Sequence, residues 1–239
     1  MRNALLLFGV PLATIHAFYV KDAPGFLYPE FARIFFWHFP CPMMATGLLV
    51  AGLIFSLKYM STEKQEWDVR ATACHELAMI FIVLTMISGI FFSKIQWGAW
   101  WQNDPRQVSF LLVLTIYTAY FVLRSAISDP AKKAMNSGGF AVAAFLPFMF
   151  LTFVYPRLPQ VVNNHPNESI MGGNIKGGYA YVIIELLILV TIITHWLYKL
   201  RSRAGLLELK LNDYGDLQTL IGAAPNSPVA RPISVSDES

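Results

Sequence analysis

The stretch YAYVIIELLILVTIITHWLY, residues 179–198, decides the fold class of this chain. It is a nearly uninterrupted apolar run of about 20 residues, the length at which an α-helix crosses the hydrocarbon core of a bilayer. Five more candidate spans lie at roughly 3–20, 34–58, 74–92, 108–127 and 140–156. The sequence therefore predicts an all-α integral membrane protein with six transmembrane helices.

The composition supports lipid as the solvent for much of the chain. Hydrophobic residues make up 55% of the 239 residues, charged residues only 14%, and the mean hydropathy is +0.48. A soluble domain carries roughly a quarter charged residues. The net charge of +3 comes without a basic cluster suited to nucleic acid, which excludes that class of partner. Two cysteines are too few for a disulfide framework.

The loops between the predicted spans differ in their content of Lys and Arg. The positive-inside rule favours an orientation with both termini in the cytoplasm. The outer segments are then 21–33, 93–107 and 157–178. The first span is interpreted as a retained helix and not as a cleaved signal peptide, because no small-x-small cleavage site ends it.

The domain organisation follows from these spans. We expect residues 1–200 to form one six-helix transmembrane domain. Residues 201–239 are polar and Pro-containing, and they are interpreted as a cytoplasmic tail with a disordered end and a short interfacial helix over 205–221. Pro147 predicts a local break in the short fifth span.

Three of the six tryptophans lie close together in the second outer segment, QWGAWWQNDPR (96–106). In a helix over 97–104, Trp97, Trp100 and Trp101 would share one face with Asp104. The pattern therefore predicts a short interfacial helix that presents three indoles as a flat plate. An aromatic anchor at the membrane surface would show the same pattern, so the tryptophans alone leave both interpretations open.

The end of this segment also carries a helix-start signal. Asp104 is a good N-cap, Pro105 suits the first helical position and Gln107 the third, which is a capping-box arrangement for the fourth span. Arg106 opposes the dipole of a helix N-terminus, so its presence is easier to explain if an anion binds there. We expect Asp104 to serve as a cap as much as a ligand contact.

Among the five histidines, His38 has the most suggestive surroundings, RIFFWHFPCPMM (33–44). With Arg33 at the outer boundary of the second span, His38 lies roughly 7 Å deep. Pro40 and Pro42 remove backbone donors and distort the helix, which opens local space beside the imidazole. An ordinary aromatic-rich helix start with a hydrogen-bonded histidine would give the same sequence.

His165 lies in the third outer segment, LPQVVNNHPNESIMGGNIKGG (158–178), where a lone histidine is usually only solvated. It nevertheless falls on the same predicted face as His38 and the tryptophan segment. The remaining histidines are interpreted as interfacial or hydrogen-bonded residues; these are His16, His75 and His195.

Two imidazoles and an aromatic shelf on one face suit haem. Haem iron takes two axial ligands, for which neutral imidazole is a common choice, and the macrocycle is flat and apolar. Arg33 and Arg106 are placed to bind its anionic propionates. Zinc is disfavoured, because no Cys or carboxylate cluster supplies a third or fourth ligand.

These residues resemble a known signature. WGAWWQNDPR is similar to the tryptophan-rich WWD signature of membrane haem-handling proteins in cytochrome c biogenesis, with Asn103 in place of its last tryptophan. The matching positions are Trp97, Gly98, Trp100, Trp101, Asp104 and Arg106. RIFFWHFP resembles a second segment of the family at Arg33, His38 and Pro40. The six-span layout and the length resemble the CcmC subfamily.

The resemblance implies a function. CcmC-like proteins hold haem b at the outer, periplasmic face of the bacterial inner membrane through two axial histidines that flank the WWD segment. They pass it to a CcmE-like haem chaperone and work with a CcmA/CcmB-like ABC complex and a small CcmD-like subunit. By position, His165 is the counterpart of the second ligand beside His38, although its surroundings depart from the usual pattern. The chain is then a haem-handling subunit without enzyme activity, and any ATPase belongs to a partner.

Three alternatives stay open. A CcsA-like synthase subunit would attach haem to apocytochrome, but such proteins are larger. A small b-type electron-transfer cytochrome would hold haem between histidines inside its helix bundle, whereas one candidate here lies in a polar loop. A plain transporter would be expected to carry more charged residues at mid-membrane depth.

Overall fold

The structure is a computed structural model that describes residues 5–21, 26–162, 164 and 177–222, the last seven of these by their backbone only. Within these residues the secondary structure is helical and contains no strand. The long helices are α4 (Pro40–Thr62), α5 (Gln65–Trp97), α6 (Pro105–Ala126), α7 (Pro130–Met149) and α8 (Gly177–Gly222). The shorter elements are η1 (Leu5–Gly9), α2 (Val10–Tyr19), η2 (Phe31–Arg33), α3 (Ile34–His38), η3 (Phe150–Val154) and η4 (Tyr155–Arg157).

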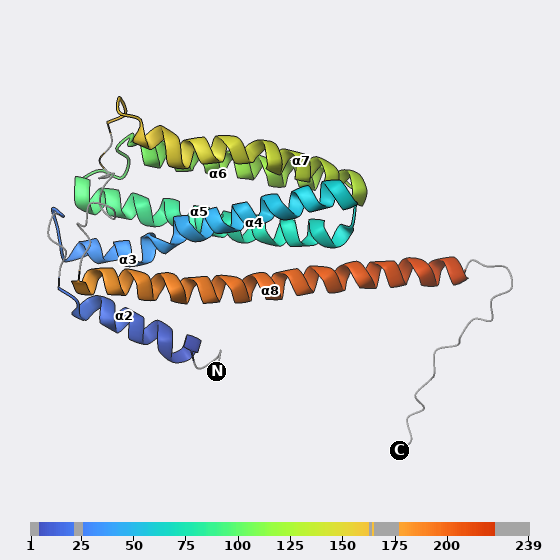
Figure 1. Cartoon of the computed structure of the whole chain (residues 1–239), viewed down its shortest axis with the longest axis horizontal. Helices are drawn as coiled ribbons and strands as arrows, with labels where there is room; N and C mark the ends of the chain where they lie inside the picture. Colours follow the sequence, from blue (N-terminus) through green and yellow to red (C-terminus); the bar gives the residue numbers. More distant parts are fainter. Residues whose placement is uncertain (1–4, 22–25, 163, 165–176, 223–239) are drawn as a thin grey trace, which may run out of the picture.

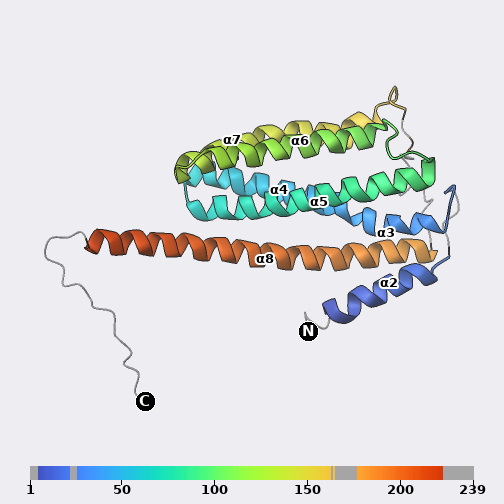
Figure 2. The same cartoon turned by 180° about the vertical axis from the view of Figure 1, so that it is seen from behind.

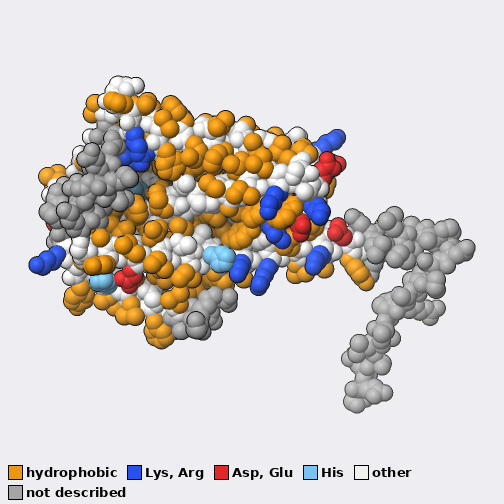
Figure 3. Space-filling view, viewed as in Figure 1, with side chains coloured by type: hydrophobic (Ala, Val, Ile, Leu, Met, Phe, Trp, Pro, Cys, Tyr) orange, Lys and Arg blue, Asp and Glu red, His pale blue; other side chains and the backbone are white. Residues whose placement is uncertain are grey.

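Five helical segments of the described chain are long and apolar enough to cross a membrane. They are Phe31–Thr62, Gln65–Trp97, Pro105–Ala126, Pro130–Arg157 and Gly177–Gly215. The first predicted span corresponds to a shorter apolar helix, Leu5–Tyr19. The prediction of an all-α integral membrane protein is confirmed. Figure 3 shows hydrophobic side chains over most of the visible face, with charged side chains gathered mainly at the end where α8 leaves the other helices.

Helices α4 to α7 form a four-helix bundle, and α8 lies along one side of it (Figure 1). The bundle core contains large side chains with almost no exposure, among them Leu49, Ile82, Tyr117 and Phe148. A second apolar cluster joins α2 and α3 to α8. The view from behind confirms that α2 packs on the side of α8 that faces away from the bundle (Figure 2).

Local sequence sets the ends of these helices. Asp129 starts α7 by accepting a hydrogen bond from the Lys132 N–H at 2.7 Å, with a proline at the first helical position. Glu63, at φ 55°, ends α4 and turns the chain into the antiparallel α5. The predicted local break near Pro147 is confirmed, because the π-helix η3 and the 3₁₀-helix η4 follow it directly. Proline lacks the N–H that a regular α-helix requires at that point.

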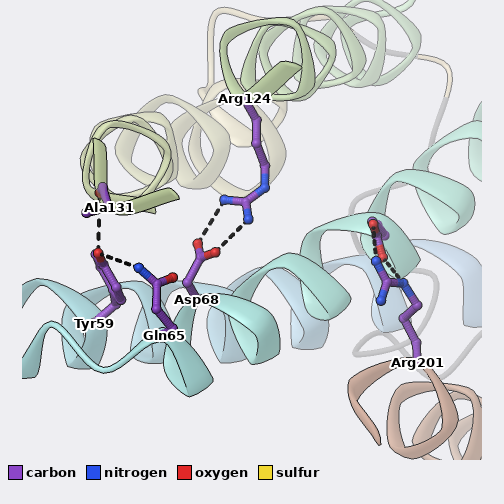
Figure 4. Close-up of polar contacts among 7 residues, drawn as sticks. Tyr59, Gln65, Asp68, Arg124, Ala131 and Arg201 are labelled. Carbon is purple, nitrogen blue, oxygen red and sulfur yellow. Dashed lines mark hydrogen bonds and ion pairs between the residues drawn. The ribbon is translucent and has the colours of Figure 1, made fainter. Parts of the chain in front are cut away.

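The end of the molecule where α5 begins is held by polar contacts (Figure 4). Arg124 of α6 donates to both carboxylate oxygens of Asp68 in α5, at 2.8 and 2.6 Å. Arg201 of α8 pairs with Glu76 of α5, with Nε and Oε2 2.6 Å apart. These pairs fix α6 and α8 against the first turns of α5.

Helix α8 is longer than the sequence predicted. Instead of ending near residue 198 and giving way to a separate interfacial helix over 205–221, it runs without a break from Gly177 to Gly222. The reason is local: Leu, Glu, Lys and Arg dominate residues 199–211, and all four are good helix formers. The boundary at residue 200 and the cytoplasmic side of both termini stay predictions.

Candidate functional site

His38 lies where two helices meet. Helix α3 ends at His38 and α4 begins at Pro40, with Phe39 between them. The Nδ1 atom of His38 is 2.8 Å from the Ser88 Oγ in α5. Because the Ser88 hydroxyl donates to the Leu84 carbonyl at 2.6 Å, it accepts from His38, which places the proton on Nδ1. The lone pair of the neutral ring is then on Nε2, the tautomer that suits a metal ligand.

Small and aromatic residues of α5 enclose the same imidazole. A Cβ atom on Gly89 would lie only 3.3 Å from the His38 Cε1 atom. The ring of Phe92 stacks with that of His38, with centroids 6.5 Å apart and planes at 14°. Sequence reasoning missed Ser88, Gly89 and Phe92, because the contact between α3 and α5 joins residues some 50 positions apart. A Ser-Gly pair within an apolar span was the available signal.

The predicted interfacial helix over 97–104 is wrong. Trp97 is the last residue of α5, and Gly98 ends that helix at φ 83°, with its N–H bonded to the Lys94 carbonyl. Residues 98–104 contain no helix, and Asn103 is also left-handed, at φ 50°. A left-handed residue immediately after Trp97 turns the chain out of helical register. The three indoles therefore do not form the predicted plate at i, i+3 and i+4.

The tryptophans instead occupy distinct positions around the end of α5. Trp97 packs its edge against Phe92, the ring that stacks on His38, with centroids 5.6 Å apart. Trp100 packs in the same way against Phe91, also at 5.6 Å, and is 53% exposed. Trp101 is 37% exposed, and its indole N–H donates to the Asn103 side chain. The structure thus brings Trp97 to His38 through Phe92 and leaves Trp100 and Trp101 partly exposed on the loop that follows.

Buried and half-buried polar side chains fix the path of this loop. The Ser93 hydroxyl donates to the Ala99 carbonyl at 2.8 Å, and Gln102 donates to the Trp97 carbonyl at 3.0 Å. The Gln107 side chain accepts from the Gln102 N–H at 3.1 Å. Gln107 therefore anchors the loop, whereas a capping box would have it reach back to Asp104.

Asp104 is 3% exposed, and each of its carboxylate oxygens accepts a hydrogen bond from a backbone N–H. Its Oδ1 atom accepts from the Arg106 N–H at 2.9 Å, which confirms the predicted N-cap of α6. Its Oδ2 atom accepts from the Asn164 N–H at 2.7 Å. Asp104 thereby joins the tryptophan loop to the residue that precedes His165. His165 itself lies outside the described residues.

The two candidate arginines have different surroundings. Arg33 donates to the Ala17 carbonyl at 2.5 Å and so connects η2 to the last turn of α2. This structural contact was not predicted from the sequence. Arg106 is partly buried at the second position of α6, next to the cap made by Asp104.

The other histidines lie elsewhere. His75 is 1% exposed in the bundle core, packed on Gly52 and the ring of Tyr120. Neither ring nitrogen has a hydrogen-bond partner among the described residues, so the interpretation of His75 as interfacial or hydrogen-bonded is wrong. The Nδ1 atom of His16 is 2.7 Å from the Glu185 carboxylate. His195 is exposed on α8.

A family model matches most of this chain, and individual known proteins match somewhat less than half of it. The sequence model of the CcmC family, described as "Heme exporter protein C", matches residues 4–204. "Heme exporter protein C" of Paracoccus denitrificans (strain Pd 1222) is 29% identical over 120 residues, which is 48% of this chain and 50% of that protein. The protein of the same name from Rhodobacter capsulatus is 29% identical over 106 residues, 44% of each chain.

A differently named relative matches a similar share of the chain. "Cytochrome c biogenesis protein CcsA" of Oenothera argillicola is 27% identical over 109 residues, 45% of this chain and 32% of that protein. These alignments thus span half or less of the length of the curated relatives.

Proposed function

This chain belongs to the CcmC family, heme exporter protein C, and from that membership we infer that it handles haem for cytochrome c biogenesis. Two of the relatives described above are named haem exporters and the third is named for cytochrome c biogenesis. The finer proposal is that the chain binds haem b at the periplasmic face of the bacterial inner membrane and delivers it to a CcmE-like chaperone. The CcmA/CcmB-like ABC complex and the CcmD-like subunit are proposed as partners, and any ATPase activity is theirs.

The observation that carries the proposal is the hydrogen bond from His38 Nδ1 to the Ser88 Oγ, at 2.8 Å. It selects the tautomer with the lone pair on Nε2, and it fixes the ring orientation, as partners behind a ligating histidine usually do. We assign His38 as one axial ligand of the haem iron and His165 as the other. Two imidazole ligands hold iron without leaving an open position for chemistry, which suits a carrier.

Aromatic and basic residues complete the proposed site. Trp97, Trp100 and Trp101 offer indole surface on which the porphyrin stacks, with Gly98 shaping the turn between the first two. Arg106 and Arg33 are proposed to bind propionates, Arg106 from the start of α6.

Asp104 is proposed as a positioning residue. It is nearly fully buried, and its two carboxylate oxygens bond to backbone N–H groups in different segments. A carboxylate that accepts two such bonds fixes both segments. It would hold the loop that carries His165 at a set distance from the tryptophans.

The ligand assignment is tested with the full chain purified in detergent. Wild type should show a Soret band after haem loading, and His38→Ala and His165→Ala should each lose most of it. His195→Ala is the matched control, because that imidazole is exposed on α8, and it should load haem normally. Unchanged haem content in both variants would contradict the assignment of His38 and His165 as axial ligands.

A second candidate function is favoured by the match to the protein named CcsA. A synthase of that kind would attach haem to an apocytochrome without a chaperone. Co-expression of this chain with an apocytochrome that carries Cys-x-x-Cys-His, in cells without chaperone and ABC genes, separates the two. Our proposal expects no covalent haem on the apocytochrome, and covalent attachment would favour the synthase.

A further inference from the structure

Helix α8 continues well past the bundle. It packs against the start of α5 as far as Gly205, where a Cβ atom would lie 2.7 Å from the Val69 side chain. From there it runs on to Gly222, about 25 Å at 1.5 Å per residue. Figures 1 and 2 show this part projecting beyond the ends of the other helices. The match to the CcmC family ends at residue 204, so the projecting part lies outside it.

The projecting part and the turn before it expose a line of apolar side chains. This α8 stripe consists of Leu200, Ala204, Leu207, Leu211 and Tyr214. Its four large members are 46%, 58%, 63% and 62% exposed, in chain order. Ser202 and Gly205, which are buried against the bundle, lie on the opposite side of the helix. The stripe therefore faces away from the bundle.

The spacing within the α8 stripe indicates what kind of surface covers it. Its members follow one another at intervals of four, three, four and three residues. This is the heptad spacing of a coiled-coil seam, which keeps side chains in one narrow line that fits a second helix. A helix that lies on a membrane surface has a wider apolar face. Figures 1 and 2 also show α8 continuing nearly straight past the bundle, and the stripe begins 23 residues after Gly177, beyond the roughly 20 residues that cross a hydrocarbon core.

Charges beside the α8 stripe define its partner further. Lys199, Arg203 and Lys210 are exposed and form a basic column along one border of the stripe. The other border carries Glu208 and Asn212. A second copy of this chain would offer that column one acidic side chain, which does not balance it. A partner helix with several acidic residues beside its own apolar line would balance the charge of the basic column.

We propose that the α8 stripe is a docking site for an amphipathic helix of a partner protein, whose border facing the basic column is acidic. The contact is a two-helix coiled coil at the end of the molecule opposite the His38 site. It does not depend on haem binding.

Synthetic peptides test this proposal on the full chain in nanodiscs. Both peptides are three heptads long with Leu at a and d; one has Glu and the other Lys at the flanking e and g positions. Fluorescence anisotropy measures binding of each labelled peptide. The acidic peptide should bind at least tenfold more tightly than the basic one. Leu207→Ala with Leu211→Ala should weaken it at least tenfold, and the matched pair Leu111→Ala with Leu112→Ala, two exposed leucines of α6 away from the stripe, should change it less than twofold.

Charge reversal and two further measurements decide between occupants. Arg203→Glu with Lys210→Glu should invert the preference, so that the basic peptide binds more tightly. Equal affinity for the two peptides would overturn the proposal, and binding of neither peptide would overturn it as well. So would a dimer in sedimentation that dissociates in the Leu207→Ala/Leu211→Ala variant, which would make a second copy the occupant. A fluorescent label at position 214 tests whether the membrane covers the stripe. If its emission lies at shorter wavelength in the nanodisc before any peptide is added, the stripe is covered by lipid and the proposal is overturned.

Discussion

At the scale of single residues, the proposed site depends on contacts made behind the side chains that would touch haem. His38 is oriented by Ser88 and is enclosed by Gly89 and Phe92, all from α5. Asp104 joins two loops with its two oxygens.

Ser88→Ala should weaken haem binding roughly 10- to 100-fold, the usual effect of removing the partner behind a ligating histidine. The variant loses the acceptor for His38 Nδ1–H, so the ring is free to rotate or change tautomer. Titration of the purified chain with haem, followed at the Soret band, measures the change. Ser125→Ala is the control, because that hydroxyl bonds only its own helix backbone and lies far from His38 in the chain. Equal affinity of Ser88→Ala and wild type would contradict the role of the hydrogen bond.

Asp104→Asn should lower haem affinity and the free energy of unfolding, the latter by about 1–3 kcal/mol. An asparagine can still cap α6 through its one oxygen, but its amide nitrogen cannot accept from the Asn164 N–H. Haem titration and thermal unfolding in detergent measure the two effects. Asp129→Asn is a matched control, since the Asp129 side chain caps α7 by accepting a hydrogen bond from the Lys132 N–H. If both variants bind haem like wild type, Asp104 is a cap and nothing more.

At the scale of elements, the end of α5 decides where the tryptophans lie. Gly98 adopts φ 83°, a conformation that costs other residues about 1–3 kcal/mol. The turn it makes separates Trp97, on the helix, from Trp100 and Trp101, on the loop. Ser93 and Gln102 then hold the loop from both sides.

Gly98→Ala should therefore reorient the two loop indoles and reduce haem affinity. Nothing lies within 4 Å of a Cβ atom at Gly98, so the effect comes from the backbone alone. The near-UV circular dichroism of the tryptophans and the haem affinity report it. Gly47→Ala, in the middle of α4 and equally without close neighbours, should leave both unchanged. An unaltered spectrum in Gly98→Ala would show that the turn does not place the indoles.

The helices and loops also show how much of the fold and of the site can be predicted from the sequence alone. Apolar length located the spans, and DPRQ located the start of α6, because both signals act over a few neighbouring residues. The helix expected over 97–104 failed at Gly98, whose left-handed conformation outweighed the i, i+3, i+4 pattern of the indoles. Ser88 and the bond from Asp104 to Asn164 were beyond prediction, since each joins segments 50 or more positions apart. The position of His165 stays a prediction.

At the scale of the whole molecule, the proposed haem site and the charged contacts occupy opposite ends of the bundle. His38 and the tryptophan loop lie where α5 ends, whereas Asp68 and Arg124 lie where α5 begins (Figure 4). A substitution at the Asp68 end should therefore leave haem binding at the other end unchanged.

Asp68→Asn should lower the free energy of unfolding by about 1–3 kcal/mol while leaving the haem affinity of the folded chain unchanged. It removes a nearly buried carboxylate that holds Arg124 with two bonds. Thermal unfolding in detergent and Soret titration measure the two quantities. Glu66→Gln breaks only an exposed pair with Arg70 at 3.8 Å, so it should cost about 0.5 kcal/mol or less. A lower haem affinity in Asp68→Asn would contradict the independence of the two ends.

The central claim is that His38 and His165 are the axial ligands of haem. Magnetic circular dichroism of the haem-loaded chain in nanodiscs tests it most directly, because low-spin iron with two imidazoles has its own signature. We predict that signature in wild type, conversion to high-spin iron in His38→Ala and in His165→Ala, and recovery of the low-spin form when free imidazole is added. Persistence of the two-imidazole signature in either variant would contradict the account.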